Sequence, residues 1–351
     1  MTLLGQALWI LVKVAFAVGF GMNIAALLAW LERKQSAVTQ DRIGANRAAI
    51  FGIAAWGLFN QIADAVKALT KEDWVPPNGL QPWHFLAPAV SMGFAAFCIS
   101  ALPFGGVVEV GGRLWSLQPI ESNVGLPLIL CFLSLGVHGV VMAGYASGSN
   151  YALLGGLRGA AQMISYEVCL AVTLAGCAFI YGTLDLQQAV IWQGHLLGGW
   201  LPAWGIFLQP LAFILFLTAG TAVTKRVPFD VPEGESEIVG YFIEYSGAKF
   251  LMFLITDFLE SIVVAGLITT LFLGGWQVPW VTLTGWVGGL IMVAAFSFKV
   301  MLVLLLMMQL RWTLPRFRFD QVLDLGWKNV LPLSMLNFIV TVWGVLLWRA
   351  R

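Results

Sequence analysis

Charged side chains are scarce in this 351-residue chain, of which only 11% are Asp, Glu, Lys or Arg. Soluble domains carry about 25% charged residues. Because the shortage extends over the whole length and hydrophobic residues reach 59%, the composition excludes an ordinary soluble protein. It indicates a membrane protein with many spans. The net charge of +1 and the lack of a basic arm also argue against nucleic-acid binding.

Cysteine is also rare, and the four cysteines are Cys98, Cys131, Cys169 and Cys177. Each lies in an apolar stretch, and none forms a C-x-x-C pair. Zinc and iron–sulfur sites need thiolates at short spacing. We therefore expect four buried, small hydrophobic side chains, with no metal, iron–sulfur cluster or flavin bound by this chain. If the protein serves a redox reaction, its electrons come from a partner.

Apolar runs of about 20 residues, the length that crosses a bilayer, recur eight times. We predict an all-α polytopic membrane protein with eight transmembrane helices in a single domain over 1–351. The first run is too long for a signal peptide and ends directly on charged residues, so we expect it to be retained. The predicted spans are 7–31, 83–103, 122–146, 161–181, 202–222, 249–273, 281–308 and 330–348.

Lysine and arginine gather on the loops of one side. The loops predicted on the other side, at 104–121, 182–201 and 274–280, contain only Arg113. The positive-inside rule therefore places the N-terminus outside. We expect a multi-pass membrane protein whose N-terminus lies on the outer side.

A segment on the predicted inner side, at about 47–74, has apolar residues at helical spacing, among them Phe59, Ile62 and Val66. Polar residues such as Lys67 fall largely on the opposite side. This pattern predicts an amphipathic helix that lies in the plane of the membrane interface.

The segment PFDVPEGESEIVGYFIEY, at 228–245, holds five of the chain's 18 acidic residues and no basic residue. Pro228, Pro232 and Gly234 disfavour a regular helix, which predicts an irregular inner loop over about 224–248. A solvated acidic loop is the ordinary alternative, but the apolar residues among the acids favour a packed, functional loop. The acids are Asp230, Glu233, Glu235, Glu237 and Glu244.

Further ionisable residues lie in or beside the predicted spans, where burying charge is costly and commonly marks a functional path. Glu167 lies in the fourth span, Glu121 opens the third, and Lys299 lies in the seventh. Asp257 and Glu260 are three positions apart in the sixth span and share a helix face. Structural ion pairs or snorkelling are the alternative. Together the groups favour a proton relay.

Five stretches in order resemble one family: ERK at 32–34, ADAVKALTKE at 63–72, SNYALLGGLRGAAQMISYEV at 149–168, PFDVPEGESEIVGYFIEYSG at 228–247 and RWTLPRFRFDQVLDLGWKNVLPL at 311–333. The chain resembles the quinone-site membrane subunit of respiratory complex I, the proton-pumping NADH:quinone oxidoreductase. The resemblance implies a subunit of a translocase that carries no redox centre, with a quinone such as ubiquinone as substrate. It also implies partners: the peripheral-arm quinone-site and iron–sulfur subunits, small membrane subunits and antiporter-like subunits. With the composition, the resemblance favours a bacterial inner membrane, with the N-terminus in the periplasm, over a mitochondrial inner membrane.

The resemblance also implies roles for individual residues. It assigns to the wall of a quinone tunnel the residues Glu32, Arg33, Arg42, Asp64, Arg311 and Arg316. It assigns to a proton or charge relay the residues Asp230, Glu233, Glu235, Glu237, Glu244, Asp257, Glu167, Glu121 and Lys299.

Three alternatives stay open from the sequence. The related membrane subunit of energy-converting hydrogenases shares the acidic loop but uses no quinone. A stand-alone ion transporter is a second alternative, although we find no internal repeat to support it. A purely structural anchor with no part in proton movement is the third.

Overall fold

The computed structural model describes residues 3–49, 52, 54–110, 113–197, 200–234, 238, 240–281 and 285–349, and helices dominate these residues. The long helices are α1 (Leu3–Thr39), α3 (Gln81–Ala101), α4 (Gly125–Ala146), α5 (Asn150–Tyr181), α9 (Gly247–Phe272), α10 (Gly285–Thr313) and α12 (Leu331–Arg349). The short helical elements are η1 (Ala55–Gly57), α2 (Phe59–Thr70), α6 (Leu186–Gln193), α7 (Gly205–Leu208), α8 (Pro210–Val223), α11 (Phe319–Asp324) and η2 (Leu325–Val330).

Among the described residues, seven helices are long and apolar enough to cross a membrane, against the eight spans expected. The fifth expected span, 202–222, is instead divided into α7 and the 14-residue α8. Gln209 between them leaves the helical conformation, with φ −138° and ψ 66°, because a residue before proline is disfavoured in a helix. By length, α8 alone spans about 21 Å, less than the roughly 30 Å of a hydrocarbon core.

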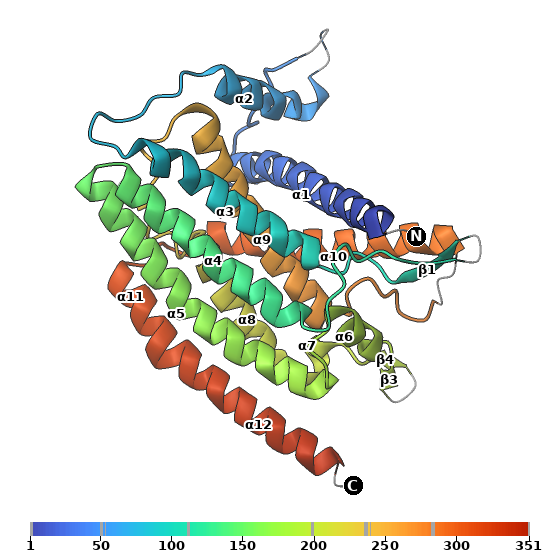
Figure 1. The fold of residues 1–351 in the computed structure, drawn as a ribbon. Helices are drawn as coiled ribbons and strands as arrows, with labels where there is room; N and C mark the ends of the chain where they lie inside the picture. The colour runs from blue at the N-terminus through green and yellow to red at the C-terminus, as the bar shows by residue number, and fades with distance from the viewer. Residues whose placement is uncertain are drawn as a thin grey trace.

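Helix α9 occupies the centre of the helical bundle. It packs against α1, α3, α8 and α10, and Figure 1 shows it between these elements. Of its most apolar stretch 72% is buried, against 17% for α1 and 17% for the helix formed by α11, η2 and α12. Ionisable groups on α9 therefore lie in the interior of the protein.

The two ends of the bundle differ in structure. Helix α2 and the long connection before it lie at one end (Figure 1). Two antiparallel hairpins lie toward the other end, near both chain termini: β1 (Val107–Val110) with β2 (Arg113–Ser116), and β3 (Leu196–Leu197) with β4 (Leu201–Pro202). Both hairpins fall in segments that the sequence predicts as outer loops.

The amphipathic helix is shorter than the predicted 47–74 segment, because α2 covers only Phe59–Thr70. The backbone is left-handed at Trp56 (φ 53°) and Gly57 (φ 91°), which ends the short η1 turn. Helix α2 therefore cannot begin before this point. A Cβ atom at Gly57 would lie 2.0 Å from the Ala45 carbonyl oxygen. The position thus requires glycine.

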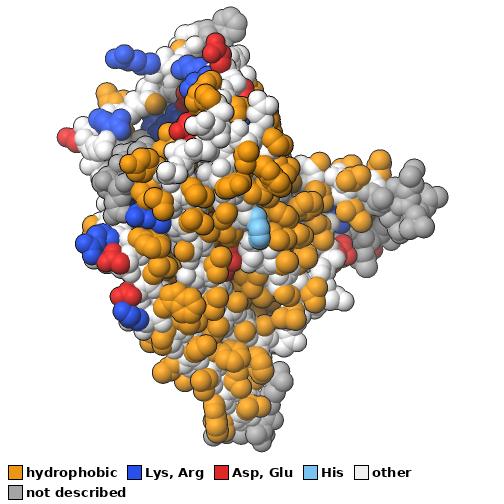
Figure 2. Space-filling model, turned by 60° about the vertical axis from the view of Figure 1, so that its left-hand side comes forward, with side chains coloured by type: hydrophobic (Ala, Val, Ile, Leu, Met, Phe, Trp, Pro, Cys, Tyr) orange, Lys and Arg blue, Asp and Glu red, His pale blue; other side chains and the backbone are white. Residues whose placement is uncertain are grey.

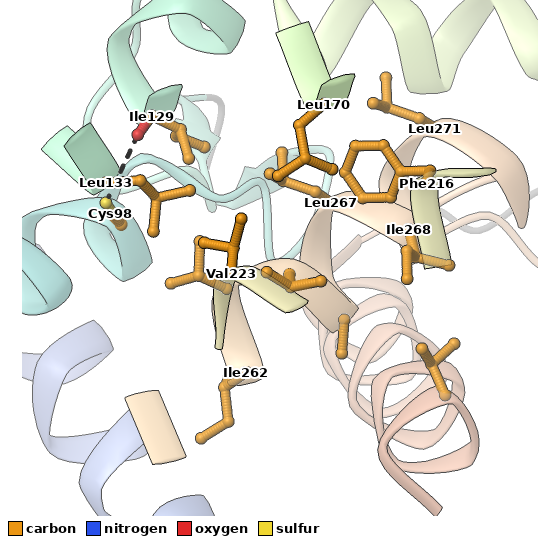
Figure 3. Close-up of a cluster of buried hydrophobic side chains, with 14 of the residues drawn as sticks. Cys98, Ile129, Leu133, Leu170, Phe216, Val223, Ile262, Leu267, Ile268 and Leu271 are labelled. Atoms are coloured by element: carbon orange, nitrogen blue, oxygen red, sulfur yellow. Dashed lines mark hydrogen bonds between the residues drawn. The ribbon is translucent and has the colours of Figure 1, made fainter. Parts of the chain in front are cut away.

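Three of the four cysteines are buried, as expected. Figure 3 shows Cys98 of α3 in the apolar core, where its thiol donates to the Ile129 carbonyl of α4 at 3.6 Å. Leu170 of α5 and Phe216 of α8 meet in the same core. The expectation is wrong for Cys131, whose side chain is exposed on the outside of α4.

Apolar side chains cover the middle of the face drawn in Figure 2, and lysine and arginine lie mainly along its upper and left margins. This distribution is that of a protein surrounded by lipid along its middle, with charge at the aqueous boundary. It agrees with the spans counted above.

Candidate functional site

Glu32, near the end of α1, lies between two arginines. Its carboxylate pairs with Arg226, which follows α8, at 3.0 Å, and with Arg311 near the end of α10. The Arg226 guanidinium also lies 4.1 Å from the centre of the Phe258 ring on α9. Three segments far apart in sequence therefore converge on one carboxylate.

A narrow cavity of about 40 Å³ adjoins this triad. Its charged members are Glu32, Arg226 and Arg311, and the rest of its wall is mostly apolar: Leu28, Thr221, Val227, Phe258, Ser261, Leu304, Met307 and Met308. At this volume the cavity holds a few water-sized groups and not a whole ligand, since ligand pockets measure roughly 300–1,000 Å³. It places three charged side chains together on a largely apolar wall.

The other residues predicted for the tunnel lie around this cavity, not on its wall. Arg33 pairs with Asp64 of α2, and both side chains are exposed. Arg42, beyond the end of α1, is exposed and donates to Gln40 at 2.7 Å. Arg316 pairs instead with an acid of the loop that follows α8. Glu32 and Arg311 thus line the cavity, whereas Arg33 and Asp64 join α1 to α2.

The irregular segment after α8 brings its first acids into the interior. Asp230 is buried and pairs with Arg316 at 3.0 Å. Burial raises the pKa of Asp230 to about 6, although Arg316 opposes the shift. Burial, with the nearby Asp257 and Asp230 carboxyls, raises the pKa of Glu233 to about 8. Both carboxyls can therefore exchange protons near neutral pH.

The remaining acids of the loop are less well placed. Glu244 is half-buried beside Tyr245, whose ring stacks on His84 with centroids 4.0 Å apart. Glu235 and Glu237 lie outside the described residues.

Lys225 is buried directly after α8 and pairs with two acids of α9. Its Nζ lies 2.9 Å from Asp257 Oδ1 and 3.4 Å from Glu260 Oε2. Burial alone would lower the pKa of Lys225, but the two carboxylates raise it well above its usual value. Lys225 therefore remains charged in the interior. The contacts confirm that Asp257 and Glu260 share one helix face.

Glu167 is buried on α5 and faces α4. Ser134 of α4 donates to Glu167 Oε2 at 2.7 Å. The other oxygen, Oε1, is buried and has no hydrogen-bond partner among the described residues. A buried carboxyl with one open oxygen is suited to accept a proton.

Two predicted relay residues have other surroundings. Lys299 of α10 donates to three backbone carbonyls just beyond α9, those of Leu273, Gly275 and Gln277, at 2.8–2.9 Å. Glu121 was expected to open a span, but it lies on the loop before α4, and 63% of its side chain is exposed. It pairs there with Lys13 at 3.5 Å. Among the described residues, no ion pair or hydrogen bond joins either side chain to the buried acids, and their part in a relay stays a prediction.

Lys225 and Arg226 were not predicted from the sequence as site residues. They stand at the end of an apolar run, where basic residues are ordinary membrane-boundary anchors. A signal was present, because two adjacent bases come immediately before the chain's densest group of acids. Glu260 was recognised as an intramembrane acid but was not included in the predicted site.

The raised pKa of Glu233 predicts a pH-dependent stability. Its ordinary pKa is 4.5, so between that value and about 8 the folded chain binds more protons than the unfolded chain. The free energy of unfolding therefore falls as pH rises through this window. We expect Glu233→Gln to raise the melting temperature of the purified chain in detergent at about pH 9 but not at about pH 4.

The matched control for this prediction is Glu109→Gln, which changes an exposed carboxylate on β1. If both variants have the melting temperature of the parent at both pH values, the stability argument for Glu233 is wrong.

The seven apolar helices and the ion pairs inside them define a polytopic membrane protein that keeps charge in its helical core. More specifically, the family model described as NADH dehydrogenase matches residues 12–342, and the chain belongs to this family. Similar relatives are each named as the H-type subunit of an NADH-quinone oxidoreductase. The relative in Protochlamydia amoebophila is 40% identical over 92% of this chain and 93% of its own. The relative in Geobacter metallireducens is 40% identical over 96% of this chain and 96% of its own. The relative in Thermomicrobium roseum is 39% identical over 96% of this chain and 98% of its own.

Proposed function

We propose that this chain is a membrane subunit of a proton-translocating NADH:quinone oxidoreductase. The observation that carries the proposal is the cavity at Glu32, Arg226 and Arg311, which adjoins a line of buried acids. The names of the relatives supply the reaction. The chain contributes residues to quinone reduction and proton movement, and partner subunits supply the electrons.

The cavity would form part of the wall beside the quinone's path, because about 40 Å³ is too small to enclose a quinone itself. Its apolar wall, with Phe258, Met307 and Met308, suits an isoprenoid tail. A quinone that takes up two electrons must also take up two protons to become a quinol, and it passes through anionic forms. Arg226 and Arg311 offer fixed positive charge and directed donors to such forms. Arg33, Asp64 and Arg42 lie outside this wall and would act at its entrance.

The buried acids form the proposed relay. Asp230 and Glu233 lie on the irregular loop, Asp257 on α9 and Glu167 on α5, and all but the partly buried Glu233 are buried. Burial favours the neutral form of a carboxyl, and a nearby cation such as Arg316 or Lys225 favours the ionised form. Opposing influences of this kind allow protons to pass between the acids. Glu235, Glu237 and Glu244 belong to this proposal through their sequence positions.

The partners and orientation are also proposed. The chain would join a peripheral arm carrying flavin and iron–sulfur clusters on the cytoplasmic side, and small and antiporter-like subunits within a bacterial inner membrane. The N-terminus would lie in the periplasm, because most lysine and arginine lies toward the opposite end.

Purification of the full-length chain through an affinity tag, from its own membranes in mild detergent, tests the function. We expect NADH:quinone reductase activity to co-purify with the chain and to be lost when its gene is deleted. Hydrogen-dependent activity with nickel-site subunits would instead support the hydrogenase alternative. A stable monomer that transports ions without NADH would support the transporter.

A further inference from the structure

We propose that Lys225 and Glu260 form a switch within the relay, in which the Lys225 ammonium moves between Asp257 and Glu260 as protons pass. This inference rests on the proposed function and adds two residues to it. In this role Lys225 is a positioning residue, since it acts through the two carboxyls that hold the protons.

The first observation is the geometry of the three groups. Asp257 and Glu260 lie almost one turn apart on α9, about 4.5 Å along the helix axis. Lys225 Nζ lies 2.9 Å from Asp257 Oδ1 and 3.4 Å from Glu260 Oε2. A change of side-chain rotamer is enough to favour either contact, and no movement of α9 is needed.

The second observation is the character of these contacts. Within the described residues, Lys225 Nζ, Asp257 Oδ1 and Glu260 Oε2 are buried and make no well-directed hydrogen bond. The nearest aromatic neighbour, Tyr241, has its ring centre 5.7 Å from Lys225 Nζ. The ammonium is thus held by charge without a fixed hydrogen-bond geometry, and it can exchange partners.

The third observation is charge balance. Two ionised carboxylates beside one ammonium would leave a net negative charge buried in a medium of low dielectric constant, which is costly. The favoured state has one ionised carboxylate, one protonated carboxyl and the Lys225 cation. When a proton binds Asp257, the ammonium is drawn to ionised Glu260. When the proton passes to Glu260, the ammonium returns to Asp257.

The fourth observation is the position of the switch between the two halves of the relay. Asp257 lies on the side of the irregular loop, since Lys225, which it contacts, lies 5.7 Å from the ring centre of Tyr241 in that loop. Glu260 faces α4, where its Oε1 lies 3.9 Å from the Cβ position at Gly136. Two residues earlier on α4, Ser134 binds Glu167. A proton shift from Asp257 to Glu260 therefore moves charge toward Glu167.

The switch is also joined to the cavity through the backbone. Arg226, the residue next to Lys225, pairs with Glu32 at the cavity. Two adjacent basic residues thus contact two different sites. Arg226 contacts the cavity proposed for the quinone, and Lys225 contacts the acids of α9. Movement of Arg226 when the cavity is occupied would be passed directly to Lys225.

The deciding variant is Glu260→Gln in the complete complex in its membranes. It leaves Lys225 in a neutral one-to-one pair with Asp257, so a structural role predicts normal assembly and normal pumping. We expect NADH:ferricyanide activity, which reports the assembled peripheral arm, to remain at the parental level. We expect NADH-driven proton pumping, measured with a pH-sensitive dye, to fall roughly ten-fold or more.

Two companions complete the test. Glu260→Asp should restore part of the pumping, since it returns a carboxyl to the same helix face. The double variant Lys225→Met with Glu260→Gln removes both charges of one pair and should assemble without pumping. Parental pumping in Glu260→Gln or in the double variant overturns the switch. If Asp257→Asn still abolishes pumping in that case, the relay stands without the switch; if it does not, the proposed relay fails as well.

Discussion

Glu32→Gln is expected to lower NADH:quinone reductase activity by about 100-fold while NADH:ferricyanide activity stays at the parental level. Removing one member of a fully buried ion pair leaves an uncompensated charge and costs about 3–5 kcal/mol. The side chains here are 17–28% exposed, so the cost is smaller. Here one carboxylate serves both Arg226 and Arg311. Its loss frees two guanidinium groups at the cavity, where they would repel one another and hold anionic quinone forms too tightly to be released. A quinone titration in isolated membranes measures the change.

The matched control is Asp324→Asn, which also converts an acid to its amide. Asp324 pairs with Lys328 one turn later on the same helix, and both side chains are well exposed. Exposed pairs contribute at most about 1 kcal/mol, so we expect parental activity. Parental quinone kinetics in Glu32→Gln itself would contradict the assignment of the cavity.

The second large effect is expected from Glu167→Gln, which keeps the size of the side chain and removes its ability to ionise. Glutamine can still accept the hydrogen bond from Ser134, so the contact between α4 and α5 is preserved. We expect proton pumping to fall roughly 100-fold, with quinone reduction falling alongside it if the two are tightly coupled. Dye quenching and NADH:quinone reductase activity, recorded on the same membranes, measure both quantities.

Two further variants sharpen this result. Ser134→Ala removes only the donor to Glu167 and should have a smaller effect than Glu167→Gln. Glu109→Gln, on the exposed β1 strand, should change neither activity. Glu235→Gln tests an acid of the loop that is proposed from sequence alone. Full pumping in Glu167→Gln and Glu235→Gln together would favour the structural-anchor alternative.

Much of the fold could be predicted from the sequence because lipid imposes a simple requirement. Any segment that crosses the hydrocarbon must be long and apolar, and seven of the predicted spans are present as such helices. The prediction failed where local chemistry competed with apolar composition. Pro210 divides the expected fifth span at Gln209 into α7 and α8, and the left-handed residues before α2 shorten the amphipathic helix.

The candidate site was less predictable, because its contacts join distant parts of the chain. Residue types and helix periodicity placed Asp257 and Glu260 on one face, and both contact Lys225. No local pattern indicates that Glu32 meets Arg311, 279 positions away. The same argument applies to Lys299. Its position in an apolar run suggested a relay, and the structure shows its ammonium donating to carbonyls of the segment that follows α9.

Three hydrogen bonds from Lys299 tie α10 to the segment that directly follows α9, through the carbonyls of Leu273, Gly275 and Gln277. The opposite end of α9, at Gly247, joins the irregular acidic segment. Lys299 therefore anchors one end of the helix that carries Asp257 and Glu260, without contacting either acid among the described residues.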